Sequence, residues 1–181
     1  MNKQSHMVNA TPAPSNPVPT LQGLAPIANA HTRIMVLGSF PGAASLAQQQ
    51  YYAHPRNHFW PIMAALWPSD PQPSAYAERC AWLLAHGVGL WDVYASCERQ
   101  GSLDSAIRSA ICNDFEHLHA QSPELALIAH NGQESYRHHT RLQHLGLPSV
   151  RLPSTSPANA SMRLEQKIDA WRAAFVPTLG L

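Results

Sequence analysis

The fold is decided by the stretch RIMVLGSFPG, residues 33–42. Four apolar residues, too few for a helix, are followed at once by a glycine, a small polar residue and a Pro-Gly turn. Such a run is typical of a strand that is buried on both faces of a parallel sheet, and the glycines let the loop after it approach a ligand closely. The glycine and lysine spacings of dinucleotide and phosphate loops are absent. The stretch therefore predicts an α/β fold with a ligand site where this strand ends.

Short apolar runs alternate with amphipathic segments along the rest of the chain. The predicted strands span residues 33–37, 88–94, 125–129 and 149–152. The predicted helices span residues 59–67, 76–86, 103–109 running on to 119, 133–145, and 161–175 with Ser161 as the N-cap. This alternation predicts a parallel sheet that is covered on both faces. Ligands bind beyond the carboxyl ends of such strands, so we expect the chemistry in the loops after residues 37, 94, 130 and 153.

The composition excludes several classes of protein. The chain has 181 residues, about the length of one domain, and its 12 Lys and Arg against 11 Asp and Glu leave a formal net charge of +1. A nearly neutral chain is not a polycation that holds nucleic acid by bulk electrostatics, although a small basic groove is compatible with it. No apolar stretch is long enough for a membrane span, and no export signal is evident.

The cysteines and prolines indicate the compartment and the domain boundary. Cys80, Cys97 and Cys112 are odd in number and form no C-x-x-C pair, which favours a reduced, cytoplasmic protein without a thiolate metal site. Residues 1–30 are rich in proline and show little periodicity, so we expect a disordered tail there. Residues 31–181 then form a single domain.

The second half of the first loop, YYAHPRNHFW at residues 51–60, concentrates aromatic, amide and cationic side chains. This mixture suits a base-sized aromatic ligand with a phosphate nearby, or else the aromatic rings belong to the core at a helix start. His54 and His58 have the i, i+4 spacing of a helical metal pair, but Pro55 between them places the first before any helix, so we expect no metal. His54 and Arg56 contact phosphate or serve as surface residues.

The later loops carry weaker signals. Residues 152–160, LPSTSPANA, bring hydroxyls and free backbone amides to a helix start, a combination that suits a phosphate and also ordinary caps. Asn131, before Gly132, reads a base edge or forms a tight turn. Asp92 ends the second predicted strand, where it is a second acid at the site or a carboxylate that braces a loop.

Three segments together resemble the uracil-DNA glycosylase superfamily, and in particular its hypoxanthine-DNA glycosylase branch. They are GSFPG at residues 38–42, YYAHPRNHFW at 51–60 and LPSTSPA at 152–158. The likeness covers about residues 32–175. It implies a three-layer α/β/α sandwich around a four-stranded parallel sheet. It further implies a DNA-repair enzyme that uses no metal or other cofactor, flips a deaminated base out of DNA and hydrolyses its N-glycosidic bond.

The chain departs from the better-known branches at two positions. The first loop of those branches carries Asp or Asn two residues after its leading glycine to act on the hydrolytic water, and Phe40 stands there in this chain. The resemblance to the hypoxanthine branch implies the amide of Asn57 as the substitute. Ser154 stands roughly where many branches place a histidine near the leaving base.

The predicted site follows from the motifs and the resemblance together. Asn57 is the predicted catalytic residue, orienting water, and Phe59 is predicted to stack on the base unless it is a core aromatic. The predicted base-binding residues are Gly38, Ser39, Phe40, Phe59 and Asn131, and the predicted DNA-binding residues are His54, Arg56, Ser154, Thr155, Ser156 and Asn159.

The predicted activity is that of a monofunctional glycosylase for hypoxanthine or uracil in DNA. A lyase needs a lysine amine near the sugar, and the only lysines are Lys3 and Lys167. Two alternatives stay open, a catalytically silent nucleic-acid-binding module on the same fold and a hydrolase of free nucleosides. DNA is the only partner that the sequence predicts; no obligate protein partner is inferred.

Overall fold

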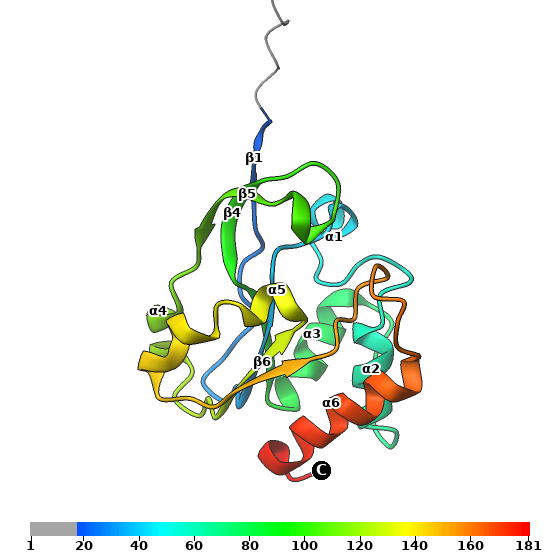
Figure 1. Cartoon of the computed structure of the whole chain (residues 1–181). Coiled ribbons are helices and arrows are strands. Elements are labelled where there is room, and N and C mark those ends of the chain that lie inside the picture. The colour runs from blue at the N-terminus through cyan, green and yellow to red at the C-terminus, as the bar shows by residue number, and fades with distance from the viewer. Residues whose placement is uncertain (1–17) are drawn as a thin grey trace, which may run out of the picture.

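A four-stranded parallel sheet forms the centre of the computed structural model, which describes residues 18–181 (Figure 1). Its strand order is β3-β2-β6-β7, and every neighbouring pair is parallel. The four strands are β2 (Ile34–Gly38), β3 (Val88–Asp92), β6 (Leu127–Asn131) and β7 (Ser149–Leu152). The parallel sheet predicted from residues 33–42 is thereby confirmed.

Both faces of this sheet are buried, as its continuous apolar strands require. In β2, Ile34 and Val36 belong to one hydrophobic cluster, while Met35 and Leu37 belong to another on the opposite face. The first cluster packs under α2 (Phe59–Leu66), α3 (Tyr76–Ala85) and α6 (Leu164–Leu179). The second packs under α4 (Phe115–Gln121) and the 3₁₀ segment η2 (His139–Leu145). Figure 1 shows α2, α3 and α6 grouped on one side and α4 on the other, so the three-layer sandwich is confirmed.

A second, three-stranded antiparallel sheet was not predicted. It has the order β1-β4-β5, and its strands are β1 (Thr20–Gln22), β4 (Tyr94–Glu98) and β5 (Arg108–Cys112). The strand predicted to run to residue 94 ends at Asp92, because Tyr94 already pairs in this other sheet. The tail predicted over residues 1–30 is also too long, since Thr20–Gln22 pairs with β4 and Ile27 bridges Leu90. Residues 1–17 lie outside the described residues.

The helix predicted over residues 103–119 is wrong in its first half. A single 3₁₀ turn, η1 (Asp104–Ala106), leads into the strand β5, and α4 begins only at Phe115, where Asp114 caps it. Strand β5 is exposed along most of its length, so it carries none of the apolar alternation by which a strand is found in sequence. Its pairing with β4 overrides the local preference.

Two further helix boundaries differ from the predictions. The predicted helix over residues 133–145 is a short α5 (Gln133–Tyr136) followed by η2, in a stretch that holds several weak helix formers. The last helix begins at Leu164, because the hydroxyl of Ser161 donates to Asn159 Oδ1 and the Gln166 side chain accepts from the Arg163 backbone. The remaining short helix, α1 (Ala43–Gln48), lies within the first loop and has six residues. Among residues 18–181, no helix combines the length and the hydropathy that a membrane crossing requires.

We expect Trp171→Ala to destabilise the protein by about 3–5 kcal/mol, the usual cost of removing a large buried aromatic side chain. Trp171 is fully buried, its ring meets Phe59 edge-on at 5.9 Å, and its indole nitrogen donates to Pro153 O at 3.1 Å. Urea unfolding measures the change. The matched control is Asp169→Ala in the same helix, whose carboxylate is 79% exposed and whose loss is expected to cost no more than about 0.5 kcal/mol. Equal midpoints for the two variants would contradict this account of the core.

Candidate active site

A cavity of about 640 Å³ opens where β2, β3 and β6 end. This is the edge of a parallel sheet at which ligands are expected, and the volume lies within the usual range of small-molecule sites. Five separate parts of the chain line it: residues 38–57, Asp92, the β4–β5 connection, Asn131 and the loop before α6. The lining residues are Gly38–Ser45, Tyr51, Tyr52, His54, Asn57, Asp92, Ser102–Ser105, Asn131 and Ser154–Asn159.

The first loop forms one wall of the cavity and contains three of the predicted base-binding residues. The carbonyl groups of Gly38 and Ser39 accept from the backbone of Val93 and Tyr94, at 2.9 and 3.0 Å, so the loop follows the chain where it leaves β3. Ser39 Oγ donates to Asp104 Oδ1 at 2.6 Å. These bonds hold the backbone of the loop in place beside the cavity.

Phe40 is the wall residue that stands where related branches carry an acid. Its ring is 6% exposed, and the guanidinium of Arg99 lies 5.0 Å from the ring centroid. Arg99 itself is 5% exposed and donates to Pro41 O. The cation therefore fixes the ring from behind, and Phe40 adds an aromatic surface to the cavity in place of a carboxylate.

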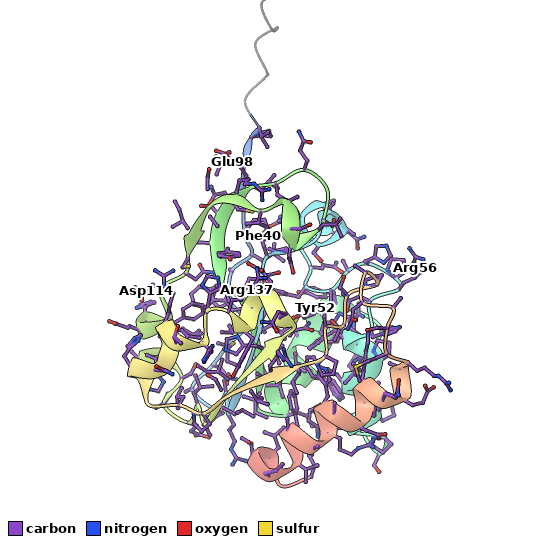
Figure 2. The ribbon with its side chains drawn as sticks, viewed as in Figure 1. Phe40, Tyr52, Arg56, Glu98, Asp114 and Arg137 are labelled. Atoms are coloured by element: carbon purple, nitrogen blue, oxygen red, sulfur yellow. The ribbon has the colours of Figure 1, made fainter. Side chains whose placement is uncertain are left out.

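Phe59 does not line the cavity, which corrects the stacking role predicted for it. Its side chain is fully buried, and Tyr52 stacks on it with ring centroids 4.1 Å apart. Tyr52 does line the cavity, and its backbone has a φ of +55°, a strained conformation for a residue with a large side chain. The aromatic surface offered to a ligand is thus Tyr52, supported from below by Phe59. In Figure 2, Phe40 and Tyr52 lie inside the molecule, whereas Arg56 projects at its outer edge.

Asn57 lines the cavity just before α2, and its side-chain amide already makes one hydrogen bond within the protein. Its Oδ1 accepts from the backbone N–H of Phe59 at 2.9 Å. A carbonyl oxygen has two lone pairs, so one remains for a second partner such as water. His54 also lines the cavity, and its Nδ1 accepts from the backbone of Arg56 at 3.1 Å. Arg56 is exposed and is not part of the cavity wall.

Asn131 and Thr155 form a reciprocal pair that joins β6 to the last loop. Asn131 Nδ2 donates to the Thr155 hydroxyl, and the Thr155 backbone donates to Asn131 Oδ1, both at 2.9 Å. Thr155 is fully buried, so its predicted contact with DNA is wrong, and its hydroxyl braces the loop instead. The second N–H of Asn131 takes no part in this pair and lies near the Tyr52 hydroxyl, at the cavity wall.

The rest of the last loop is held from inside by α6. The ammonium group of Lys167 donates to Asn159 O at 2.9 Å, and the whole side chain is buried. Ser154 Oγ and Ser156 Oγ each accept from a loop N–H at 3.2 Å, which leaves both O–H groups available as donors. Burial lowers the pKa of the Lys167 amine.

Asp92 is the more deeply buried of two acids that line the cavity, the other being Asp104. It ends β3, is 4% exposed, and its Oδ2 has no hydrogen-bond partner among the described residues. Burial and then the charge of Asp104 raise the pKa of the Asp92 carboxyl to about 7, while Arg99 opposes the shift. The only signal in the sequence was its place at a strand end.

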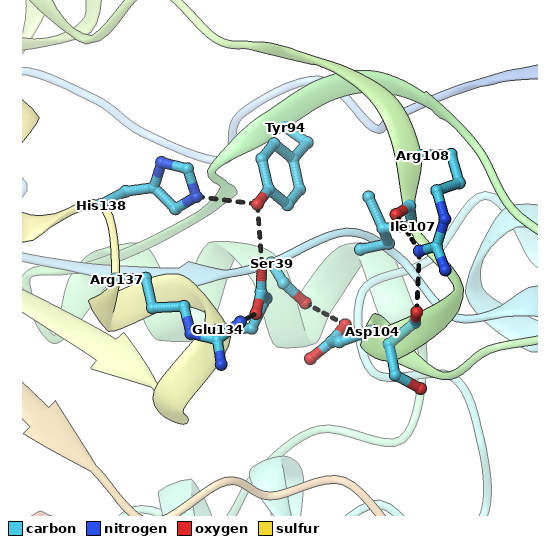
Figure 3. Close-up of polar contacts among 9 residues, drawn as sticks. Ser39, Tyr94, Asp104, Ile107, Arg108, Glu134, Arg137 and His138 are labelled. Atoms are coloured by element: carbon cyan, nitrogen blue, oxygen red, sulfur yellow. Dashed lines mark hydrogen bonds and ion pairs between the residues drawn. The ribbon is translucent and has the colours of Figure 1, made fainter.

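The β4–β5 connection was missed as part of the site because a helix was predicted there. Figure 3 shows how it and α5 are held beside the first loop. Asp104 accepts from Ser39, while the Tyr94 hydroxyl donates to Glu134 Oε1 at 2.9 Å and lies 2.7 Å from His138 Nε2. On the same connection, Leu103 lines the cavity while 58% exposed. Its apolar side chain therefore lies at the mouth.

Comparison with known proteins agrees with this geometry. The model of the Uracil DNA glycosylase superfamily matches residues 25–180. The chain belongs to this superfamily. Within it, the chain is 34% identical over 154 residues to proteins named "Hypoxanthine DNA glycosylase" from Methanosarcina barkeri and Methanosarcina acetivorans, covering 85% of this chain and 97% of each relative.

A solved member of the superfamily has the same fold. It is a solution NMR structure from Methanosarcina acetivorans, described as a candidate uracil DNA glycosylase, which matches with a TM-score of 0.77 and 33% identity. The match covers 86% of this chain and 96% of that one. The family resemblance expected from residues 38–42, 51–60 and 152–158 is thus confirmed.

We expect Asp92→Asn to change how stability depends on pH. The folded protein holds the Asp92 proton up to about pH 7, whereas the unfolded chain releases it near the ordinary value of 3.8, so the wild type loses stability as pH rises between these values. The loss approaches about 1.4 kcal/mol per pH unit within that window and is absent from the variant. Melting temperatures from about pH 5 to pH 8 measure it, with Asp169→Asn as the exposed control. Parallel curves for wild type and Asp92→Asn would contradict the raised pKa.

Proposed function

We propose that this superfamily member is a monofunctional DNA glycosylase that removes deaminated bases, hypoxanthine or uracil, and so initiates base-excision repair. The observation that carries the proposal is the cavity itself. It offers two aromatic surfaces, Phe40 and Tyr52, together with neutral polar groups, in a chain similar over nearly its whole domain to proteins named hypoxanthine DNA glycosylase. A base can reach such a cavity only after it has been flipped out of the duplex.

The base is held by stacking and by neutral hydrogen bonds. Tyr52 provides the face on which the base stacks, an interaction of about 1–3 kcal/mol in nucleic-acid sites. The second N–H of Asn131, which Thr155 does not use, and the loop from Gly38 to Phe40 meet the edge of the base. Because these groups include donors and acceptors but no fixed charge, they suit the amide-like edges that deamination creates.

Cleavage of the glycosidic bond develops positive charge on the sugar and negative charge on the base. Asn57 can orient water through the free lone pair of its Oδ1, but an amide is too weak a base to remove the proton early. The water therefore attacks a sugar that is already largely cationic. Stabilisation of the leaving base then contributes more than activation of the water.

The DNA backbone meets the rim of the cavity. We assign phosphate contacts to His54, Arg56, Ser154 and Ser156, because the two serine hydroxyls are available as donors and Arg56 is exposed. Asn159 lies at the tip of the last loop, where Lys167 fixes its backbone. Its side chain donates to Ser154 O at 3.0 Å, which stabilises the loop that faces DNA.

The proposal excludes lyase chemistry by Lys167. A Schiff base needs an accessible amine, and Lys167 is buried with its ammonium group bonded to Asn159 O. The other lysine, Lys3, lies outside the described residues. We also propose a cytoplasmic location, which the three free cysteines support.

One assay tests the function. Labelled oligonucleotides with a single inosine or uracil are incubated with the protein, treated with alkali to cut abasic sites, and compared with samples without alkali and with free inosine. We expect strand cleavage only after alkali and no hydrolysis of the nucleoside. Binding without cleavage of either lesion would favour the alternative of a catalytically silent nucleic-acid-binding module. The argument for that alternative is Phe40, which stands where better-known branches carry Asp or Asn. Cleavage without alkali would contradict the monofunctional assignment.

Asn57→Ala is expected to lower the single-turnover rate of excision by about 10²-fold or more, as for loss of a group that positions a reactant. Because Asn57 also accepts from the Phe59 backbone, Asn57→Asp serves as the matched variant: it keeps an acceptor for that bond and for water. We expect it to retain a far larger share of the rate. Melting temperatures report any damage to the start of α2. Full activity of a folded Asn57→Ala protein would remove Asn57 from the mechanism.

A further inference from the structure

Two buried polar atoms lie near the end of β2 in residues that line the cavity. Asp92 Oδ2 has no hydrogen-bond partner among residues 18–181, and the Tyr52 hydroxyl has no partner within hydrogen-bond distance there except a weak interaction with the Asn131 side chain. Buried polar groups without partners are rare in folded proteins, and a ligand is one of the few explanations for such a group at a cavity wall. The proposed function uses the ring of Tyr52 but neither of these polar atoms.

Gly38 is what brings the two groups together. A Cβ built on Gly38 would lie 2.3 Å from Asp92 Oδ1 and 3.7 Å from the Tyr52 hydroxyl. Gly38 and Asp92 are also register partners in the parallel sheet. The missing side chain therefore creates the space that the Asp92 carboxyl occupies, and any other residue at position 38 would push the carboxyl away.

We propose that Asp92 is a catalytic residue of this glycosylase, which in its neutral acid form donates a proton to the base as the base departs. This inference rests on the proposed function and names the group that stabilises the leaving base. Asn57 cannot do so, because an amide does not transfer a proton at the pH of the cell. Phe40, the neighbouring residue of the first loop, has no proton to donate.

The step balances without a further reactant. The bond between C1′ of the sugar and the base nitrogen breaks, and its electron pair goes to the base, which takes the proton of Asp92. Water adds to C1′, and the proton that it releases returns to the Asp92 carboxylate directly or through solvent. The products are the free base and an abasic sugar that carries a hydroxyl, and the enzyme is regenerated.

Burial and the neighbouring charges keep Asp92 in its acid form up to about pH 7. Asp104, on the β4–β5 connection, raises the pKa of Asp92 in addition to the effect of burial, and Arg99 on the same connection lowers it. From the first loop, Tyr51 and Tyr52 face it as neutral phenols, whose pKa values are raised by burial and then by the charge of Asp92 itself. With a pKa of about 7, Asp92 can donate a proton below that pH and is deprotonated above it.

The test is the pH profile of single-turnover excision from inosine DNA for wild type and Asp92→Asn, at saturating enzyme. Asparagine keeps a hydrogen-bond donor in the same place but has no proton to transfer. We expect the wild-type rate to fall as pH rises above about 7, and the variant to be slower by about 10²-fold or more at low pH with a flat profile. The two rates converge at high pH. Equal rates and parallel profiles would overturn the proposal.

Asp104→Asn is the matched control, since it removes the neighbouring charge and leaves the proposed donor in place. Its profile should keep the descending limb but move it to lower pH, because the pKa of Asp92 falls when the like charge is gone. If the descending limb disappeared in Asp104→Asn and persisted in Asp92→Asn, the proton donor would be Asp104 and not Asp92. That result would overturn the proposal.

Two measurements keep the result interpretable. Binding of each variant to an oligonucleotide with 2′-fluorinated deoxyinosine, which resists cleavage, and its melting temperature report folding and affinity separately from chemistry. If Asp92→Asn does not fold, the carbon-13 chemical shift of the Asp92 carboxyl in the wild type decides: titration near 3.8 overturns the proposal, and titration near 7 supports it. A wild type that cleaves no lesion contradicts the proposed function, whereas equal cleavage rates of wild type and Asp92→Asn at low pH contradict only the role of Asp92.

Discussion

The approach of the first loop to the carboxyl group of Asp92 is the contact on which the site depends. Strands β2 and β3 run parallel and in register, so their last residues, Gly38 and Asp92, end side by side. A side chain at position 38 would occupy the place of the carboxyl. The loop can therefore leave the sheet directly above Asp92, whose pKa burial raises to about 7. Ser39 and Phe40 follow as parts of the cavity wall.

The opposite wall depends on a different kind of support. The last loop has little apolar surface of its own, and its shape comes from buried polar contacts with α6 and β6. Lys167 and Trp171 donate to loop carbonyl groups from within, and Asn131 exchanges two hydrogen bonds with Thr155. Buried polar networks of this kind specify one conformation when all their members are bonded. The loop thus presents its free serine hydroxyls in a defined place, although it is irregular backbone.

In these two walls, the enzyme has neutral side chains, Phe40 and Ser154, at the positions where the resemblance implies an Asp or Asn and a histidine in related branches. Asn57 and Ser154 can orient and donate, yet neither can carry a full charge. The buried acid Asp92 lies instead on the neighbouring strand β3, below the loop. The sequence around Asp92 contains no motif for this role, since the acid reaches the cavity only through the register of β2 and β3.

Strong local patterns made much of the fold predictable. The apolar run before Gly38, the other short runs and the amphipathic helices predicted a parallel sheet between helices, and the motifs at residues 38–42, 51–60 and 152–158 identified the family and most of the cavity wall. Strand β5 was missed because its residues are exposed and pair only through backbone hydrogen bonds with β4. The same error hid Asp104, which lies in the connection between those strands.

By itself, the sequence determined the sheet, the family and the residues near the site, because hydrophobic periodicity and motif spacing are local properties of the chain. Tertiary structure alone decided which of these residues face the cavity. Phe59 carries a suitable side chain but is fully buried and does not line the cavity, and the buried Thr155 hydroxyl is bonded to Asn131. Tyr52 and the serines beside Thr155 are therefore the groups that a ligand can meet. Burial and the proximity of charges from distant segments also decide whether Asp92 holds a proton. Neither quantity exists until the chain has folded.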